Sequence, residues 1–287
     1  MKIIPKIGLH VSVAGGFYKG IEYANNIGLT AIQIFGSSPR QWKVKFPIEE
    51  DLKKYFEYKK LSKVEAVYLH APYIANPASF DEELRNKSVK VLLDHYKIAF
   101  MLDAEGLILH LGSGKDNSKE KAIDNLVLSL KEILSSEIFN KKQKTKILLE
   151  NSASSKKVGY SIDELSSIFK AVNSKQLGLC IDTAHALGSG MIQEYTKESV
   201  KKLFDEIDEQ IGLERLEVIH TNDSKVPANS NNDRHEHIGR GFIGLKGFQA
   251  LAGDERLREK SWILETPKED DKDWDKENVA AILDLFK

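Results

Sequence analysis

Short runs of apolar and β-branched residues alternate along the chain with longer stretches of helical periodicity. Each short run has the length of one strand and is apolar on both faces, which is typical of strands buried in a parallel sheet. There are eight such runs: IGLHVS from Ile7, AIQIFG from Ala31, AVYLHAP from Ala66, GLILHLG from Gly106, KILLEN from Lys146, LGLCID from Leu177, LEVIHTND from Leu216 and SWILETP from Ser261.

The stretches between these runs predict amphipathic helices. Apolar residues follow the i, i+3, i+4, i+7, i+11 spacing of one helix face. Examples are Ile123, Leu126, Val127, Leu130 and Leu134, and Val200, Leu203, Phe204, Ile207 and Ile211. Two Ser-x-x-Glu patterns, Ser79 with Glu82 and Ser161 with Glu164, match the capping box that satisfies free N–H groups at a helix start.

Eight strand and helix pairs in 287 residues fit a closed (β/α)8 TIM barrel, an α/β fold whose active site lies at the C-terminal ends of the strands. A doubly wound open sheet is the competing architecture. No Pro/Gly/Ser-rich linker or low-complexity tract divides the chain, so we expect residues 1–287 to form a single domain.

Composition narrows the class of protein. With 41% apolar and 30% charged residues the chain can bury a sizeable core, and its one cysteine, Cys180, means that a metal site must use mainly His, Asp and Glu. The opening MKIIPKIGLH lacks the apolar core of a signal peptide, and no run approaches the roughly 18 apolar residues of a membrane span. We therefore expect a cytoplasmic protein without membrane contact. The formal charge of −1 argues against a nucleic-acid partner unless bound metal changes the balance.

Metal-competent side chains end six of the eight predicted strands: His70, His110, Glu150, Asp182, His220 and Glu265. In a barrel these six meet at one mouth. A single His or Glu at a strand end is more often a hydrogen-bonded loop anchor, but six clustered ionisable groups are costly to bury without a compensating cation. Because side chains alternate along a strand, the residues two positions earlier predict an apolar layer below the mouth: Tyr68, Ile108, Leu148, Cys180, Val218 and Ile263.

Two local motifs add ligands of the same kind. Asp182 and His185 are spaced i, i+3 just past a strand, and Asp233 and His235 are spaced i, i+2 in a Gly-flanked loop. His and carboxylate ligands without thiolates fit Zn, Mn or Fe, and sites rich in His favour Zn. Nine ligands suffice for two or three ions if one carboxylate bridges, and a site with several metal ions indicates phosphoryl-ester chemistry.

Three other residues have simpler interpretations, and a fourth is a rival ligand. We expect Cys180 to be a buried core residue. We expect His10 to anchor a strand or to lie behind the metal ligands and hold them in place, and His95 to be an ordinary helix residue. His237 is the one plausible rival ligand, because it follows His235 by two positions.

Taken together, the motifs resemble the endonuclease IV family of zinc-dependent apurinic/apyrimidinic-site endonucleases. The match runs from IGLHVSVAGG near Ile7 to ILETP near Glu265 and includes, in order, FGSSPRQW, LHAPYIANPAS, LHLGSG, LLENSAS, CIDTAHAL, HTNDSK and DRHEHIG. The resemblance implies a (β/α)8 barrel with three zinc ions per chain. It implies that the first ion is bound by His70, His110 and Glu150, the second by the bridging Glu150 with Asp182, His220 and Glu265, and the third by His185, Asp233 and His235. Among these ligands, Glu150 and Glu265 are the residues we expect to act in catalysis.

The resemblance also implies a reaction and a DNA substrate. The enzyme is expected to hydrolyse the phosphodiester 5′ to an abasic site, leaving a 3′-hydroxyl and a 5′-deoxyribose phosphate, and to remove 3′-blocking groups. Tyr73 and Ile74 are expected to insert at the lesion while the abasic sugar turns out of the stack, with Arg40 helping to fill the gap. The expected partner is double-stranded DNA with abasic sites or 3′-blocked ends, bound by a monomer.

Three residues depart from the family's pattern: Pro77, Gly114 and Arg240. None of them is a predicted ligand, so these differences affect the shape of the loops and the charge around the site but not the metal centre itself. Two other functions compete with the endonuclease. One is a metal-dependent sugar isomerase or epimerase of the related barrels, and the other is a barrel that only binds damaged DNA. The Asp233 and His235 pair favours the endonuclease over the isomerase, which has little use for a third metal ion.

Overall fold

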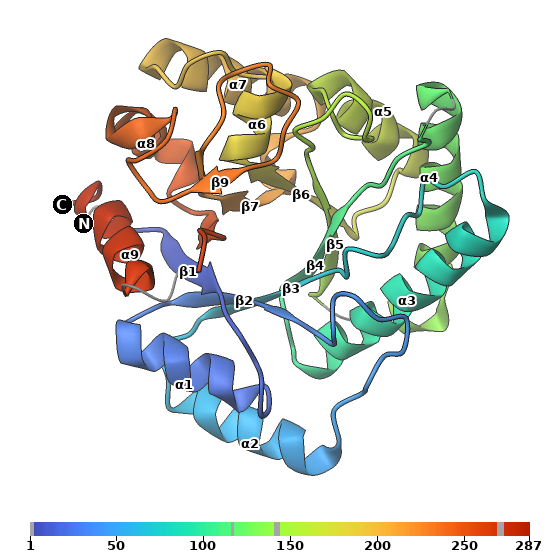
Figure 1. Cartoon of the computed structure of the whole chain (residues 1–287). Coiled ribbons are helices and arrows are strands. Elements are labelled where there is room, and N and C mark those ends of the chain that lie inside the picture. The colour runs from blue at the N-terminus through green and yellow to red at the C-terminus, as the bar shows by residue number, and fades with distance from the viewer. Residues whose placement is uncertain (1–2, 116–117, 141–143, 269–272) are drawn as a thin grey trace.

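The computed structural model describes residues 3–115, 118–140, 144–268 and 273–287, and eight parallel strands close into a barrel within them (Figure 1). Around the barrel the order is β1, β2, β3, β4, β5, β6, β7, β10 and back to β1. Their bounds are β1 (Lys6–His10), β2 (Ala31–Phe35), β3 (Ala66–His70), β4 (Gly106–His110), β5 (Lys146–Glu150), β6 (Leu177–Asp182), β7 (Leu216–His220) and β10 (Ser261–Leu264). The predicted barrel is confirmed, and the open-sheet alternative is wrong because β1 pairs with β10.

Helices surround the barrel on its outside (Figure 1). Those in the described residues are α1 (Tyr18–Ile27), α2 (Glu49–Lys60), α3 (Glu82–Met101), α4 (Lys119–Leu134), α5 (Ile162–Val172), α6 (Thr183–Ser189), α7 (Lys197–Gln210), α8 (Gly244–Ala252) and α9 (Trp274–Asp284), with 3₁₀ turns at Glu137–Asn140, Leu213–Arg215 and Glu255–Leu257. None of the described helices combines the length and apolar character that crossing a membrane requires.

A single apolar layer fills the middle of the barrel. Its buried members are Ala31, Ala66, Tyr68, Ile108, Leu148, Cys180, Val218 and Ile263, which include all six predicted residues. On β1 the equivalent position is Gly8, where a Cβ would lie only 2.5 Å from the carbonyl oxygen of Ala31 and 2.7 Å from Cδ1 of Ile263. The layer closes the barrel below the strand ends, so water reaches the mouth only from the loop side.

One predicted helix cap is confirmed and the other is wrong. Ser161 caps α5, because its hydroxyl accepts a hydrogen bond from the N–H of Glu164, but the reciprocal half of the capping box does not form: the carboxylate of Glu164 accepts from Gly159 and Tyr160 and not from Ser161. α3 begins at Glu82, and its cap is Asp81, whose carboxylate accepts a main-chain N–H at 3.1 Å. Ser79 stands too early for this role and accepts the N–H of Asp81 in the preceding turn. An aspartate next to the first helical residue is the better placed acceptor for the free N–H groups.

A two-stranded antiparallel hairpin lies between β7 and α8 in the chain. It consists of β8 (Asp223–Ser224) and β9 (His235–Glu236), and its loop carries Asp233. Because connections that follow barrel strands run over the C-terminal face, this hairpin belongs to the same face as the strand-end ligands.

Candidate metal centre

Each barrel strand contributes one polar side chain to a ring at the mouth: His10, Gln33, His70, His110, Glu150, Asp182, His220 and, directly after β10, Glu265. The strand register sets His110 opposite Glu150 and Asp182 opposite His220. The six residues predicted from the strand ends are therefore brought together. Sequence analysis missed Gln33, although it follows Ala31 of the apolar layer by two positions and the same alternation points it to the mouth.

Glu150 is fully buried and lies between imidazoles from three strands. Its Oε2 is 3.2 Å from Nε2 of His70 and 3.1 Å from Nδ1 of His110, and its Oε1 is 3.1 Å from Nδ1 of His220. Burial alone would raise the pKa of Glu150, but the adjacent His110 and His220 hold it well below its ordinary value. The carboxylate is therefore ionised and presents both oxygens to the surrounding imidazoles.

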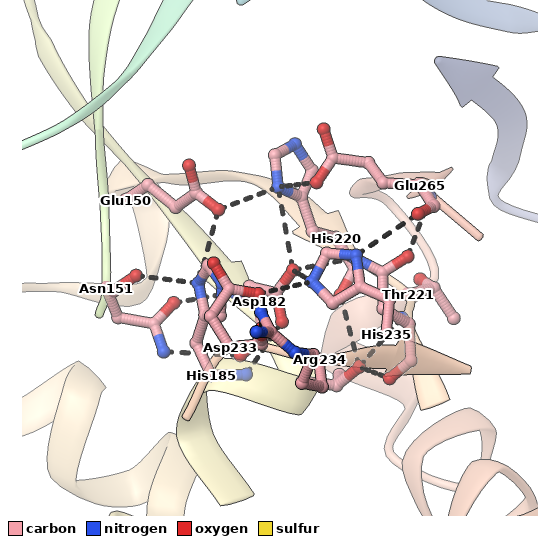
Figure 2. A network of polar contacts seen from close by, with 12 residues as sticks. Glu150, Asn151, Asp182, His185, His220, Thr221, Asp233, Arg234, His235 and Glu265 are labelled. Atoms are coloured by element: carbon pink, nitrogen blue, oxygen red, sulfur yellow. Dashed lines mark hydrogen bonds and ion pairs between the residues drawn. The ribbon is translucent and has the colours of Figure 1, made fainter. Parts of the chain in front are cut away.

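A second set of contacts centres on His220 (Figure 2). Its Nδ1 lies 3.3 Å from Oε2 of Glu265 and 3.9 Å from Oδ2 of Asp182. Its other nitrogen, Nε2, donates to Oε1 of Gln33 at 2.7 Å, and Gln33 in turn donates to Glu265 at 2.5 Å. Gln33 therefore holds His220 in the form that leaves Nδ1 for a metal ion, a role that outer hydrogen-bond partners commonly have.

The third set of contacts joins α6 to the hairpin. Asp233 places Oδ2 at 3.1 Å from Nε2 of His185 and Oδ1 at 3.4 Å from Nε2 of His235, which also lies 3.4 Å from Oδ2 of Asp182 (Figure 2). Burial alone would lower the pKa of His185, but Asp182 and Asp233 raise it to about 10. The carboxylates of Asp182 and Asp233, which favour a proton on His185, would favour a bound cation for the same electrostatic reason.

Eight of the nine predicted ligands form three overlapping groups, and the ligand atoms of each group lie within 4.8 Å of one another. The groups are His70, His110 and Glu150; Glu150, Asp182, His220 and Glu265; and Asp182, His185 and His235. The ninth, Asp233, contacts both histidines of the last group. Nε2 of His185 and Nε2 of His235 are buried, and within the described residues they face carboxylate oxygens of Asp182 and Asp233 without forming a well-aligned hydrogen bond. Buried nitrogens of this kind, in an imidazole and carboxylate donor set, fit Zn²⁺.

Two asparagines that sequence analysis missed hold the carboxylates in place. Asn222 donates to Oδ2 of Asp182 at 2.6 Å and accepts the N–H of Glu265 at 2.7 Å. The side chain of Asn151 accepts the N–H of Asp182 at 2.6 Å, and its main-chain oxygen lies 3.0 Å from Nδ1 of His185. Both asparagines follow a strand-end ligand within two residues in LLEN and HTND, a signal that the sequence did contain.

A cavity of about 1670 Å³ opens over the centre, lined by the loops that follow β1 and β2 together with His70, His110, His185, Asp233, His235 and Glu265. Tyr73 lines it too, is 58% exposed, and stacks on His110 with ring centroids 6.3 Å apart. Arg40 is exposed and Ile74 is half-buried, and neither is among the described residues that line the cavity. Of the three predicted DNA contacts, Tyr73 is the one next to the ligands.

The other histidines do not belong to the three groups of described ligands. His10 places Nδ1 at 2.9 Å from Nε2 of Gln33 and 3.3 Å from Glu265, so it supports ligands as expected. His237 stacks its ring on that of Trp274, with ring centroids 4.0 Å apart. His95 is buried in α3, as expected of a helix residue.

The departures from the family's pattern each have a local packing partner. A side chain at Gly114 would bring its Cβ within 2.9 Å of Phe80, so glycine makes room for that ring. The carbonyl of Pro77 accepts the hydroxyl of Ser129 at 2.8 Å. The guanidinium of Arg240 lies 4.3 Å above the ring of Trp274.

Comparisons with known proteins agree with this geometry. A family model described as xylose isomerase-like TIM barrel matches residues 21–286. The probable endonuclease 4 of Aquifex aeolicus (strain VF5) is 39% identical over 280 residues, which cover 97% of this chain and 97% of the relative. The solved endonuclease IV from Thermus thermophilus matches with a TM-score of 0.82 and 30% identity, covering 98% of this chain and 97% of that one.

A D-tagatose 3-epimerase-like protein matches with a TM-score of 0.72, covering 98% of this chain and 96% of that one, but at 24% identity this is a likeness of fold alone. The probable endonuclease 4 of Sulfurihydrogenibium sp. (strain YO3AOP1) is 35% identical over 281 residues, which cover 98% of this chain and 99% of the relative. The chain therefore belongs to the endonuclease IV family, within the xylose isomerase-like TIM barrels.

Proposed function

We propose that this chain is a DNA-repair hydrolase that cleaves the phosphodiester 5′ to abasic sites in duplex DNA, leaving a 3′-hydroxyl and a 5′-deoxyribose phosphate. We extend the proposal to the removal of 3′-blocking groups, which requires hydrolysis of the same kind of bond. The observation that carries it is the chain of three ligand groups that share the carboxylates of Glu150 and Asp182 at one mouth. A centre of several metal ions is suited to phosphodiester hydrolysis.

We assign three Zn²⁺ ions to these groups. His70, His110 and Glu150 would hold the first, Glu150, Asp182, His220 and Glu265 would hold the second, and His185, Asp233 and His235 would hold the third. Asp233 would complete the third set because it contacts both histidines, and Asp182 belongs to both the second and the third ligand group. When bound, such ions lower the pKa of water and stabilise charge on the attacking and leaving oxygens.

The protein's own residues prepare the centre for this chemistry. Glu150 supplies negative charge at a buried position and Glu265 at a partly buried one, and Gln33 holds both His220 and Glu265 by hydrogen bonds. The apolar layer that includes Cys180 keeps water out from below. Electrostatic interactions between a phosphate and the centre are therefore stronger than they would be in bulk water.

We propose that Tyr73, Ile74 and Arg40 contact the DNA. Tyr73 is the exposed ring at the edge of the ligand cluster, and an aromatic ring there can stack where the base is missing. Ile74 follows it in the same loop and adds an apolar surface, while Arg40 offers an exposed positive charge on the neighbouring loop after β2. A missing base also lowers the stacking cost of turning the sugar out.

We further propose that residues 1–287 act as one domain and as a monomer in the cytoplasm. The barrel closes only by pairing β1 with β10, so nearly the whole chain contributes to one closed sheet. The ligand groups are complete within one chain, and no second copy is needed to supply a residue.

A sugar epimerase is the weaker alternative, because the likeness to the D-tagatose 3-epimerase-like barrel is one of fold alone. The decisive assay uses a duplex oligonucleotide with one abasic site and a 5′ label, beside the undamaged duplex and a chelator-treated sample. We expect zinc-dependent cleavage of the damaged duplex only, with a product that a polymerase can extend from its 3′-hydroxyl. A protein loaded with zinc that leaves this duplex intact, or that epimerises ketoses instead, would overturn the proposal.

A further inference from the structure

We propose that Asp223 is a positioning residue that holds the hairpin loop bearing Asp233 and His235, and through it the third set of metal ligands. The inference rests on the proposed function, because it concerns how that metal centre is built. Asp223 itself belongs to none of the three ligand groups found among the described residues.

The carboxylate of Asp223 is fully buried and accepts hydrogen bonds from main-chain N–H groups of the loop. Oδ1 accepts the N–H of Ser224 at 2.8 Å and that of Ile243 at 2.9 Å. Oδ2 accepts the N–H of Gly239 at 2.9 Å and that of Gly241 at 3.0 Å. The N–H of Gly244 lies between the two oxygens, 3.2 Å from Oδ2 and 3.4 Å from Oδ1. We call these five N–H groups the Asp223 cage. A buried charge is costly unless it is paired or hydrogen-bonded, and here main-chain dipoles compensate it.

The cage encloses both ends of the ligand-bearing loop. The loop leaves β8 at Ser224, carries Asp233, returns through His235 in β9 and then passes the carboxylate at residues 239–244. Ser224 is in register with His235, and the carbonyl of Ser224 accepts the N–H of Phe242 at 2.8 Å. Asp223 therefore fixes the strand that pairs with the ligand strand and also the segment that follows it.

The backbone of this loop is built around the carboxylate. A Cβ on Gly241 would lie 2.5 Å from Oδ1 of Asp223 and 2.2 Å from the carbonyl oxygen of Ser224. Gly239 adopts φ +81°, a conformation that favours glycine. The close approach at Gly241 and the positive φ at Gly239 let both N–H groups reach one side of the same carboxylate.

The test is Asp223→Asn, which keeps the shape of the side chain. Because each oxygen accepts at least two N–H groups, either orientation of the amide turns an NH₂ group toward main-chain donors. We expect zinc binding at the third site to weaken by about 10- to 100-fold, the range typical for loss of an outer partner. Competition with a chromophoric chelator should therefore show one weakened ion per chain and two ions bound as in the unaltered protein.

Asp254→Asn is the matched control. Asp254 also accepts a main-chain N–H, from Arg256 at 3.1 Å, but it caps the 3₁₀ turn that leads into the start of β10, at the opposite end of the barrel. This variant should keep all three zinc affinities. A purely structural role for Asp223 predicts a different result, namely lower thermal stability with no selective loss of one ion, and that result would overturn the inference.

Two further measurements apply if Asp223→Asn does not fold. Gly241→Ala pushes the loop away while keeping the carboxylate, and it should weaken the same single ion. In the unaltered protein, the amides of Gly239, Gly241 and Ile243 should stay protected from hydrogen exchange after chelation, because the cage holds the loop without metal. Fast exchange of these amides in zinc-free protein would show that zinc holds the loop, against the inference. Failure of the proposed function is distinguishable, since the unaltered protein would then bind fewer ions or leave abasic DNA intact.

Discussion

Glu150 has two oxygens and four imidazole neighbours, His70, His110, His185 and His220, and its one buried charge belongs to two of the ligand groups. This is the arrangement expected of a carboxylate that bridges two cations. His110 and His220 stabilise the ionised form of Glu150, because they hold its pKa low although the side chain is completely buried.

We predict that Glu150→Gln lowers the rate of abasic-site cleavage by at least about 1000-fold, or about 4 kcal/mol in activation free energy. The amide keeps the shape of the side chain but cannot neutralise two cations, so elemental analysis should also show fewer zinc ions. Glu217→Gln is the matched control, because Glu217 is the neighbour of the layer residue Val218 on β7 and pairs with Lys146 away from the mouth. Full zinc content with an unchanged rate in Glu150→Gln would exclude the bridging role.

A different result is predicted for Tyr73→Ala, which removes a ring and no ligand. Base stacking on an aromatic ring is worth about 1–3 kcal/mol, so binding of abasic duplex should weaken by roughly 10-fold or more while zinc content stays constant. Tyr73→Phe retains the ring and should retain most of the affinity. Fluorescence anisotropy with a labelled duplex measures both, and equal affinity in all three proteins would contradict the proposed stacking.

At the scale of the elements, the recurring apolar runs predicted the eight strands, and the residues at the ends of these runs predicted six side chains of the mouth. Alternation along each strand then predicted the apolar layer, because a period of two leaves no freedom once one face is assigned. The same rule applied to β1 and β2 would have completed the ring with His10 and Gln33. Two-residue strands such as β8 and β9 carry no periodic pattern, so the hairpin and its cage became visible only in three dimensions.

Helix caps show where a short motif is ambiguous. Both Ser-x-x-Glu patterns look alike in the sequence, yet Ser161 caps α5 whereas Asp81 displaces Ser79 at α3. The carboxylate of Asp81, two residues after Ser79, is a stronger hydrogen-bond acceptor than a hydroxyl, and Asp81 is directly next to the first residue of the helix. The sequence patterns therefore predict where the helices lie more accurately than they predict the residue at which each helix begins.

We predict that Ser161→Ala lowers the free energy of unfolding by about 1 kcal/mol, because the N–H of Glu164 loses its acceptor. Ser167→Ala is the control on the same helix, since the hydroxyl of Ser167 only donates to a carbonyl one turn back. Urea unfolding of the zinc-loaded proteins gives both values. Equal stability of the two variants would contradict the assigned cap.

At the scale of the whole molecule, charge connects the metal centre to DNA binding. The formal charge of −1 already counts the carboxylate ligands as ionised, so three divalent ions, which carry six positive charges, would raise it to +5. The added charge lies at the mouth, and the exposed Arg40, Lys43 and Lys45 lie on the loop after β2 that borders the cavity. Because a field reaches only about 8 Å at physiological salt, charge at the mouth matters more than the total.

We therefore predict that zinc-free protein that is still folded by circular dichroism binds abasic duplex much more weakly than the zinc-loaded protein. The salt dependence should also be shallower, because fewer phosphate contacts are neutralised. Binding isotherms at several salt concentrations measure both quantities. Equal affinity and an equal salt slope would mean that the basic loops suffice without metal.

The central claim is that three zinc ions held by nine side chains form a centre for abasic-site cleavage. Zinc content and the cleavage rate of a 5′-labelled abasic duplex should be measured in the same samples while zinc is added back to chelated protein. We predict that the cleavage rate reaches its maximum only as the zinc content approaches three ions per chain. A maximal rate at one ion per chain, or no cleavage at three, would contradict it.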